Sequence, residues 1–348
     1  MTYFFPSSIT SIPKKQEILS ELKNTVDSGT NALRILLRSF ELEPNSKIAI
    51  PAFVCDAVQM AVIEENHNPF PLDLKAGHTF WTNYDLDKIA EEKIQAIILV
   101  HLYGFIHPDT AEIIAFCKKK QIKLIHDAAQ SFGIQENLLS GDGIIYSFGP
   151  GKSTTAAGGA YIKNLKLASN HFIINKPSFF SFQNSSAKLF LKSRIVGYKK
   201  SKIENLTGLF ISKLSLKSKS ISSMSKFQLK MASYVIANFK TNEVLRKMRY
   251  DVFQERIKNN SLIELIPVNH LAGLNFKIIL FIENNVKKFK SFLTENYIPY
   301  FSLSDHISKN EDLENFNQNA DKIIEISCES SIAEVEIIRI ANLLSTYR

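Results

Sequence analysis

The sequence predicts an α/β protein with a mainly parallel sheet covered by helices on both faces, followed by a small α+β domain. Between about residues 30 and 165, strand-like apolar runs alternate with segments whose apolar residues recur at helical spacing. The chain has 348 residues, which suits two domains of roughly 150 residues each. Because 45% of the residues are hydrophobic and 22% charged, the chain can bury a sizeable core and is not a disordered chain.

Six short apolar runs predict the strands of the large sheet. They are KIAIPA at 47–52, PFPLDL at 69–74, AIILVHL at 96–102, IKLIHDA at 122–128, GIIYSF at 143–148 and GAYI at 159–162. Four amphipathic segments between the strands predict the helices 31–42, 56–66, 84–93 and 110–120. The last of these ends in three lysines, which suit the negative end of a helix dipole.

The C-terminal part has a different order of elements. A long helix is predicted over 241–260, a strand over 274–282, a helix over 284–296 and a terminal helix over 333–347. We therefore divide the chain into a large domain (1–164), a basic segment rich in Ser, Lys and Phe (165–240) and a small C-terminal domain (241–348).

The positive charge is concentrated in one segment. The net charge is +8, but residues 161–240 contain fifteen basic residues and one acid, Glu204, so the remainder is mildly acidic. Three interpretations of this segment stay open: a solvated, partly helical insertion, a peripheral contact with anionic lipid, and a path that attracts a diphosphate-bearing substrate. Nucleic acid is the least supported partner, because the chain contains no recognised binding module.

Cysteine usage and the absence of an apolar leader favour a cytoplasmic location for the protein. The basic segment would support a variant of this location, in which the protein contacts the inner membrane surface peripherally. The three cysteines, Cys55, Cys117 and Cys328, are too widely spaced for a disulfide framework or a zinc site. No run reaches the roughly 18 apolar residues that a membrane-spanning helix needs. No histidine pair has metal-ligand spacing, so we expect no metal site.

Two short motifs lie where the sheet would present them at its carboxyl edge. The first, Ser28-Gly29-Thr30-Asn31, opens an apolar helix whose free N–H groups could hold a phosphate, although such residues are usually only a cap. The second is HDAAQ, in which Asp127 ends a buried strand and Gln130 follows three residues later. A buried carboxylate needs a cationic or hydrogen-bonding partner to stay charged, and a protonated pyridine nitrogen would be one.

The third motif is the loop around Lys152. A strand containing Ser147 runs into a Gly/Pro turn that carries this lysine. A lysine in a dry pocket becomes a nucleophile that forms a Schiff base with an aldehyde. The alternative, a P-loop ending in Gly151-Lys152-Ser153, fails at its first position, which is Tyr146 instead of glycine.

Together, SGTNAL, HDAAQ and the Ser147 to Lys152 loop resemble the DegT/DnrJ/StrS family of sugar aminotransferases that depend on pyridoxal phosphate. IPAFVCDAV, PLDL and HLYG support the resemblance over about 25–165, and it is looser beyond. It implies a fold-type I architecture, with Lys152 as the Schiff-base lysine and proton shuttle and Asp127 as the partner of the pyridine nitrogen. It also implies that Gln130 binds the ring hydroxyl. The phosphate cup would then contain Gly29, Thr30 and Ser147.

The sequence departs from the family pattern at four places. Cys55 stands where many relatives place an aromatic ring against the cofactor, and Ser131 replaces a histidine after HDAAQ. The stretch TTAAGG lacks the usual Gly-Glu pair. Ile221 and Ser223 replace an asparagine and an arginine that reach the neighbouring subunit's phosphate. Lys219 and Lys226 are the nearby candidates for that contact.

The resemblance implies a homodimer that moves an amino group, usually from glutamate, onto a keto carbon of a nucleotide-linked sugar for surface polysaccharide. Two alternatives remain: a non-catalytic binding or scaffold protein, and another pyridoxal reaction on a keto-deoxy sugar. Members of the second kind have histidine at the lysine position, so Lys152 argues against it. Packed roles are favoured for His101 and His126, and surface salt bridges for Arg246 and Arg249 over contact with an amino-donor carboxylate.

Overall fold

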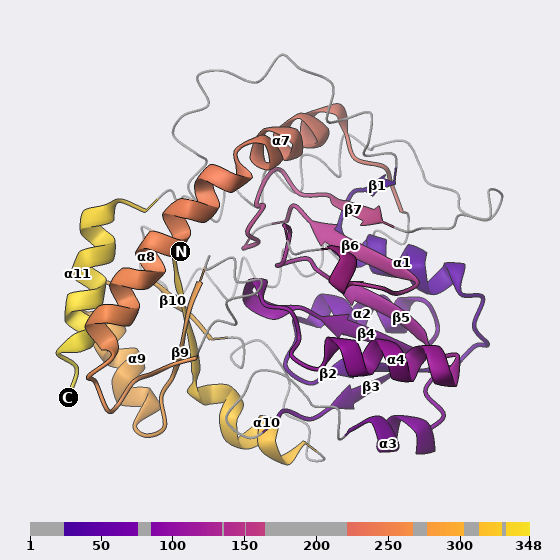
Figure 1. Ribbon diagram of the computed structural model, residues 1–348, viewed down its shortest axis with the longest axis horizontal. Helices are drawn as coiled ribbons and strands as arrows, with labels where there is room; N and C mark the ends of the chain where they lie inside the picture. The colour runs from indigo at the N-terminus through magenta and orange to yellow at the C-terminus, as the bar shows by residue number, and fades with distance from the viewer. Residues whose placement is uncertain are drawn as a thin grey trace, which may run out of the picture.

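A computed structural model describes residues 24–75, 85–133, 136–149, 151–163, 221–266, 277–302, 313–328 and 332–348 (Figure 1). Two sheets form the centres of a large and a small domain, as Figure 1 shows. The predicted fold class is confirmed, because the larger sheet is mostly parallel and helices pack on both of its faces.

The large sheet has seven strands in the order β1-β7-β6-β5-β4-β2-β3. They are β1 (Thr25–Val26), β2 (Lys47–Pro51), β3 (Asn68–Leu72), β4 (Ala96–Val100), β5 (Lys123–Asp127), β6 (Gly143–Ser147) and β7 (Ala160–Lys163). The strands from β6 to β3 run parallel, β7 pairs antiparallel with β6, and β1 pairs antiparallel with β7. Every predicted run of the large domain forms a strand, because β-branched residues suit strands that are buried on both faces.

Helices cover the two faces of this sheet as their apolar stripes require. α1 (Gly29–Ser39) and α2 (Asp56–Glu64) pack on one face, in a core that includes Leu36, Ile98 and Ile145. α3 (Asp85–Glu91) and α4 (Thr110–Lys120) cover the other face, where Ile97 and Leu99 are buried. The described residues also form 3₁₀ turns at Leu102–Gly104, Glu136–Leu138 and Ala320–Lys322.

Most of the basic segment, residues 164–220 with Lys219, lies outside the described residues. The remainder is part of the folded body: Ile221 is buried in the large-domain core, and α7 (Lys226–Ala237) runs into α8 (Phe239–Ile257). The predicted boundary at residue 240 therefore falls inside a helix. Ser225 and Gln228 form a capping box that starts α7, and this signal lies in the sequence.

The small domain is built on a four-stranded antiparallel sheet in the order β10-β11-β9-β8. Its strands are β8 (Glu264–Leu265), β9 (Lys277–Phe281), β10 (Tyr300–Phe301) and β11 (Ile323–Ser327). Its helices are α8, α9 (Val286–Glu295), α10 (Glu314–Asn319) and α11 (Glu334–Ser345). Figure 1 shows α8 beside α11, and one sheet face packs on these helices through Ile278, Leu280 and Ile326.

The other face of the small sheet lies against the large domain. Ile279, Phe281 and Ile323 pack with Phe53 and Tyr103 in a cluster that joins the two domains. Alternation along β9 and β11 therefore separates two buried faces instead of one buried and one exposed face. This second face positions the small domain over the carboxyl ends of the parallel strands.

A carboxylate of the large domain caps a helix of the small one. The Asp73 carboxylate accepts hydrogen bonds from the N–H groups of Asn315 (2.9 Å) and Phe316 (2.8 Å) in the first turn of α10. These are two of the donors that a helix start leaves without partners, so the contact stabilises α10 and holds the two domains together.

None of the helices in the described part of the chain combines the length and apolar character that membrane crossing requires.

Candidate active site

A cavity of about 160 Å³ opens between the two domains at the carboxyl edge of the large sheet. Its large-domain side is formed by Val54, Cys55, Val100, Leu102, Tyr103, Asp127, Ala129, Gln130, Gly151 and Lys152. Lys277, Phe301 and Glu325 of the small domain complete it. Of the residues singled out in the sequence, Cys55, Asp127, Gln130 and Lys152 are thus brought together, as expected for ligand sites of open α/β sheets.

Asp127 is the last residue of β5 and is only 4% exposed. Its Oδ1 accepts the N–H of Ala129 at 2.9 Å, and among the described residues no hydrogen-bond donor reaches Oδ2. Burial raises the pKa of this carboxyl, while the Lys152 charge and the Ala129 hydrogen bond act in the opposite direction. A cationic ligand group beside Oδ2 would relieve the cost of burying the charge.

Gln130 is oriented by a backbone group of the neighbouring turn. The N–H of Tyr103 donates to its Oε1 at 2.9 Å. With the amide oxygen engaged in this way, the NH₂ group is left to act as a donor in the cavity. The turn requires an unusual conformation, since Tyr103 has a φ of 58° and Gly104 a φ of 88°.

The Lys152 loop is held by short-range hydrogen bonds. The N–H of Lys152 donates to Oγ1 of Thr155 at 2.9 Å, and Oγ1 of Thr154 donates to the carbonyl of Ser147 at 2.9 Å. Gly159 has a φ of 100°, and a Cβ there would come within 2.5 Å of Met224. The TTAAGG stretch thus forms a defined loop despite its departure from the family pattern.

Gly29 and Ser147 lie against each other beside this loop. A Cβ on Gly29 would stand 3.3 Å from Oγ of Ser147, so only glycine leaves this space open. The side chain of Ser28 caps α1 by accepting the N–H of Asn31 at 3.2 Å, which leaves the first-turn N–H groups of Gly29 and Thr30 available. A free helix start next to a hydroxyl fits a phosphate.

The small-domain side of the cavity contains two charged residues that the sequence analysis did not single out. Glu325 is 3% exposed, and its carboxylate accepts the hydroxyl of Tyr103 at 2.8 Å and pairs with Lys277. The Lys277 Nζ also lies 5.5 Å from the ring centroids of Tyr103 and Phe301. Only Glu325 interrupts an apolar run, in β11, whereas Lys277 stands at the first position of β9.

His101 and His126 have packed roles behind the cavity. The N–H of His107 donates to Nδ1 of His101 (3.1 Å), so His101 donates from Nε2 to Nδ1 of His126 (3.0 Å), and His126 donates to the carbonyl of Ser140 (3.1 Å). Both imidazole rings are neutral in this series of hydrogen bonds, because the Nδ1 of each ring accepts a hydrogen bond. Burial lowers the pKa of both imidazoles, to about 4 for His126.

The two arginines of α8 donate hydrogen bonds to backbone carbonyls, and the surface salt bridges expected for them stay a prediction. Arg246 is 2% exposed and donates to the carbonyl of Ser153 at 2.6 Å, next to Lys152. Arg249 donates to the carbonyls of Cys328 (3.4 Å) and Ile332 (2.5 Å). Both arginines therefore help to fix loops near the cavity.

Of the two residues that replace the cross-subunit motif, Ile221 is buried and Ser223 is half-buried, while the nearby candidate Lys226 is exposed at the start of α7.

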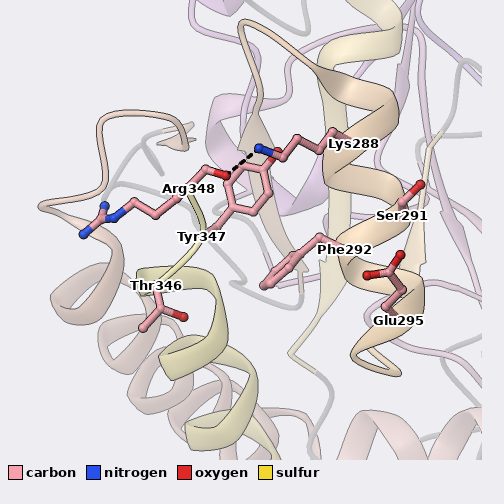
Figure 2. A pocket seen from close by; sticks show the side chains of 7 residues that line it. All are labelled: Lys288, Ser291, Phe292, Glu295, Thr346, Tyr347 and Arg348. Atoms are coloured by element: carbon pink, nitrogen blue, oxygen red, sulfur yellow. Dashed lines mark hydrogen bonds between the residues drawn. The ribbon is translucent and has the colours of Figure 1, made fainter.

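Another cavity, of about 240 Å³, lies away from this site in the small domain, between α9 and the end of the chain (Figure 2). In Figure 2 the Nζ of Lys288 donates to the carbonyl of Arg348, at 2.9 Å, beside the ring of Tyr347. None of the residues singled out from the sequence lines it. We therefore take the cavity between the domains as the functional site.

Comparison with known proteins places the chain in a family. The profile of the DegT/DnrJ/EryC1/StrS aminotransferase family matches residues 21–344. The chain belongs to this family. Aminotransferases of this family depend on pyridoxal 5'-phosphate.

Curated members resemble the chain over part of its length. A UDP-N-acetyl-3-dehydro-α-D-glucosamine 3-aminotransferase of Acidithiobacillus ferrooxidans is 33% identical over 138 residues, which are 38% of this chain and 36% of that protein. A 3-oxo-glucose-6-phosphate:glutamate aminotransferase of Bacillus subtilis is 34% identical over 38% of this chain and 30% of that protein. The match thus spans about a third of the length of these relatives.

Solved structures resemble the chain over most of its length. Streptomyces venezuelae DesV in complex with a ketimine intermediate aligns with a TM-score of 0.71 over 94% of this chain and 86% of that chain, at 15% identity. NtdA of Bacillus subtilis with bound cofactor PMP aligns with a TM-score of 0.66 over 92% and 72%, at 18% identity. At such identities the likeness establishes the fold.

Proposed function

We propose that this protein is a pyridoxal-phosphate-dependent aminotransferase that moves an amino group from glutamate onto the keto carbon of a nucleotide-linked sugar, for surface polysaccharide. One observation carries the proposal: Lys152 and the buried Asp127 line the same cavity without a direct ion pair between them. An amine and a carboxylate held apart at a sheet edge leave room for a ligand that meets both.

The residues of this chain fit the cofactor at three points. The space between Gly29 and Ser147 at the start of α1 would hold the phosphate. Asp127 Oδ2 would hold the proton on the pyridine nitrogen, and the ring charge would offset the burial of the carboxylate. The NH₂ group of Gln130 would donate to the ring oxygen.

The chemistry assigned to the chain is proton transfer at a fixed place. When bound, pyridoxal phosphate supplies an electron sink for the electron pair left at the substrate carbon. Lys152 Nζ would hold the cofactor through its aldehyde carbon, with water as the leaving group, and the free amine would move a proton to and from the substrate carbon. The loop hydrogen bonds at Thr154 and Thr155 hold the backbone that carries this amine.

The substrate class comes from the relatives. The matched proteins of A. ferrooxidans and B. subtilis act on a 3-dehydro and a 3-oxo sugar, one linked to UDP and the other to phosphate, and the latter has glutamate in its name. We accordingly propose carbon 3 of a phosphate-bearing sugar as the acceptor. The three free cysteines suit a reducing cytoplasm as the place of the reaction.

A homodimer remains part of the proposal. Apolar side chains are exposed on α2 and α8, among them Ile63 (46%), Val244 (60%) and Met248 (59%). Contact surfaces are marked by exposed apolar side chains that form a contiguous patch, and Val244 and Met248 lie four residues apart on one face of α8. Light scattering of the full chain would measure the assembly.

The test is amino transfer by the full chain reconstituted with pyridoxal phosphate. Glutamate and a panel of 3-keto sugars linked to UDP, dTDP or phosphate would be supplied, and amino sugar and 2-oxoglutarate measured by mass spectrometry. We expect both products in equal amounts with at least one acceptor, and neither with Lys152→Ala. A protein that binds the cofactor at Lys152 but transfers no amino group to any acceptor would contradict the proposal and favour a binding role.

A further inference from the structure

The buried ion pair of the small domain is connected to Gln130 through a single residue. Tyr103 donates its hydroxyl to Oε1 of Glu325 (2.8 Å) and its backbone N–H to Oε1 of Gln130 (2.9 Å). Lys277 pairs with the other carboxylate oxygen of Glu325 and lies over the Tyr103 ring. A continuous set of contacts thus runs from the small domain to a residue of the cofactor cavity.

The strand register places the ion pair on the sheet face that contacts Tyr103. In the antiparallel pair of β9 and β11, Ile279 is opposite Glu325 and Lys277 is opposite Ser327. Lys277 and Glu325 are therefore diagonal neighbours on one face, the face whose Ile279 packs with Tyr103. The contact between the two domains is apolar where Ile279 packs on Tyr103, and next to the cavity the same sheet face carries the ion pair instead.

The backbone of Tyr103 needs such support. Its φ of 58° lies in the left-handed region, which is costly for a bulky side chain and persists only when the surroundings impose it. The Tyr103 side chain is 1% exposed, and its hydroxyl donates a hydrogen bond to the Glu325 carboxylate, which is a strong acceptor. Holding the ring in place also holds the N–H that orients Gln130.

We propose that Glu325 and Lys277 are positioning residues: through Tyr103 they keep the Gln130 amide oriented as a hydrogen-bond donor toward the ring oxygen of the bound cofactor. The inference rests on the proposed function only in that pyridoxal phosphate occupies this cavity. A donor at the ring oxygen stabilises its ionised form, so loss of the orientation should make the bound cofactor titrate at higher pH.

The test is the pH titration of the visible absorbance of the lysine-bound cofactor in the full chain. Glu325→Gln and Tyr103→Phe should each move the apparent pKa upward, by about one pH unit, which corresponds to losing a charge-assisted hydrogen bond. Glu283→Gln is the matched control, because Glu283 forms a lysine pair on the surface of the same domain (3.0 Å to Lys322) and should leave the titration unchanged.

A double variant separates positioning from a general loss of packing. Gln130→Leu alone should shift the titration at least as far, and adding Glu325→Gln to it should give no further shift, since the effect passes through Gln130. An unchanged titration in Glu325→Gln, or an equal shift without Gln130, would overturn the inference while the proposed function stands. A wild-type protein without lysine-bound absorbance would overturn both.

Discussion

Each side of the cavity contributes one lysine and one buried acid, and the two pairs are built differently. On the large-domain side, Asp127 ends a strand and Lys152 lies in a loop, and no direct ion pair joins them. On the small-domain side, Lys277 and Glu325 lie on neighbouring strands and pair directly. A lysine and an acid that do not pair leave room for a ligand between them. A direct ion pair between two strands stabilises the structure around it. The same residue types therefore serve different roles because of where the backbone places them.

The largest expected difference is between the two lysines. Lys152→Ala should lower amino transfer by about 10³-fold or more, because we propose this lysine as both the cofactor's covalent partner and the proton carrier. Lys277→Met should lower it by roughly tenfold, since it acts through Tyr103. Steady-state kinetics with saturating cofactor would measure both, and equal losses would remove the distinction between the two sides.

The two buried acids should differ next. Asp127→Asn should reduce kcat by roughly 10²-fold, because the charge that keeps the ring nitrogen protonated is lost. The more exposed Asp142, which pairs with Lys123 at 3.3 Å, offers the control Asp142→Asn with little change expected. If Glu325→Gln lowered kcat as strongly as Asp127→Asn, the small-domain acid would be catalytic and not positioning.

The histidine chain behind Asp127 predicts a pH dependence of stability. His101 and His126 are neutral in the folded chain and their pKa values are lowered, so protonation favours the unfolded state. The contribution of His126 is complete above about pH 6.5 and is lost as the pH falls from there toward 4, at roughly 1.4 kcal/mol per unit, and His101 acts in the same direction.

Urea unfolding at pH 7.5, 6 and 5 would measure this loss. A His126→Gln variant, which cannot titrate at that position, should show a shallower fall in the free energy of unfolding. If the free energy of unfolding fell equally steeply with decreasing pH in both proteins, the histidine pair would not be the cause of the pH dependence.

A smaller effect is expected where the domains are joined away from the cavity. Asp73→Ala removes the cap of α10 and should lower the free energy of unfolding by about 1 kcal/mol, with little effect on cofactor titration. Asp251→Ala is the control, because Asp251 is exposed on α8 and caps no helix. Denaturant unfolding would measure both, and equal losses would argue against a cap across the domains.

The large-domain side of the cavity could be predicted from the sequence because its signals are local. A buried apolar strand ends in Asp127, Gln130 follows three residues later, and a glycine-rich turn carries Lys152. Parallel strands then bring such ends to one edge whatever the rest of the chain does. The family resemblance gave these residues their expected roles.

The small-domain side could not be predicted in the same way. Lys277 and Glu325 are far apart in sequence, and a charge in a short strand usually faces solvent. Only the packing of the second sheet face against Phe53 and Tyr103 makes both of them interior. The start of α7 was missed for another reason, since the lysine-rich composition obscured the capping box at Ser225 and Gln228.

The central claim is that the cofactor is held by the lysine of the large-domain side. Borohydride reduction of the reconstituted full chain, followed by peptide mass spectrometry, would fix the cofactor on the amine that bonds it. We predict the added mass on the peptide that contains Lys152, and on no other. Cofactor mass on the Lys277 peptide, or on neither lysine of the cavity, would contradict the account.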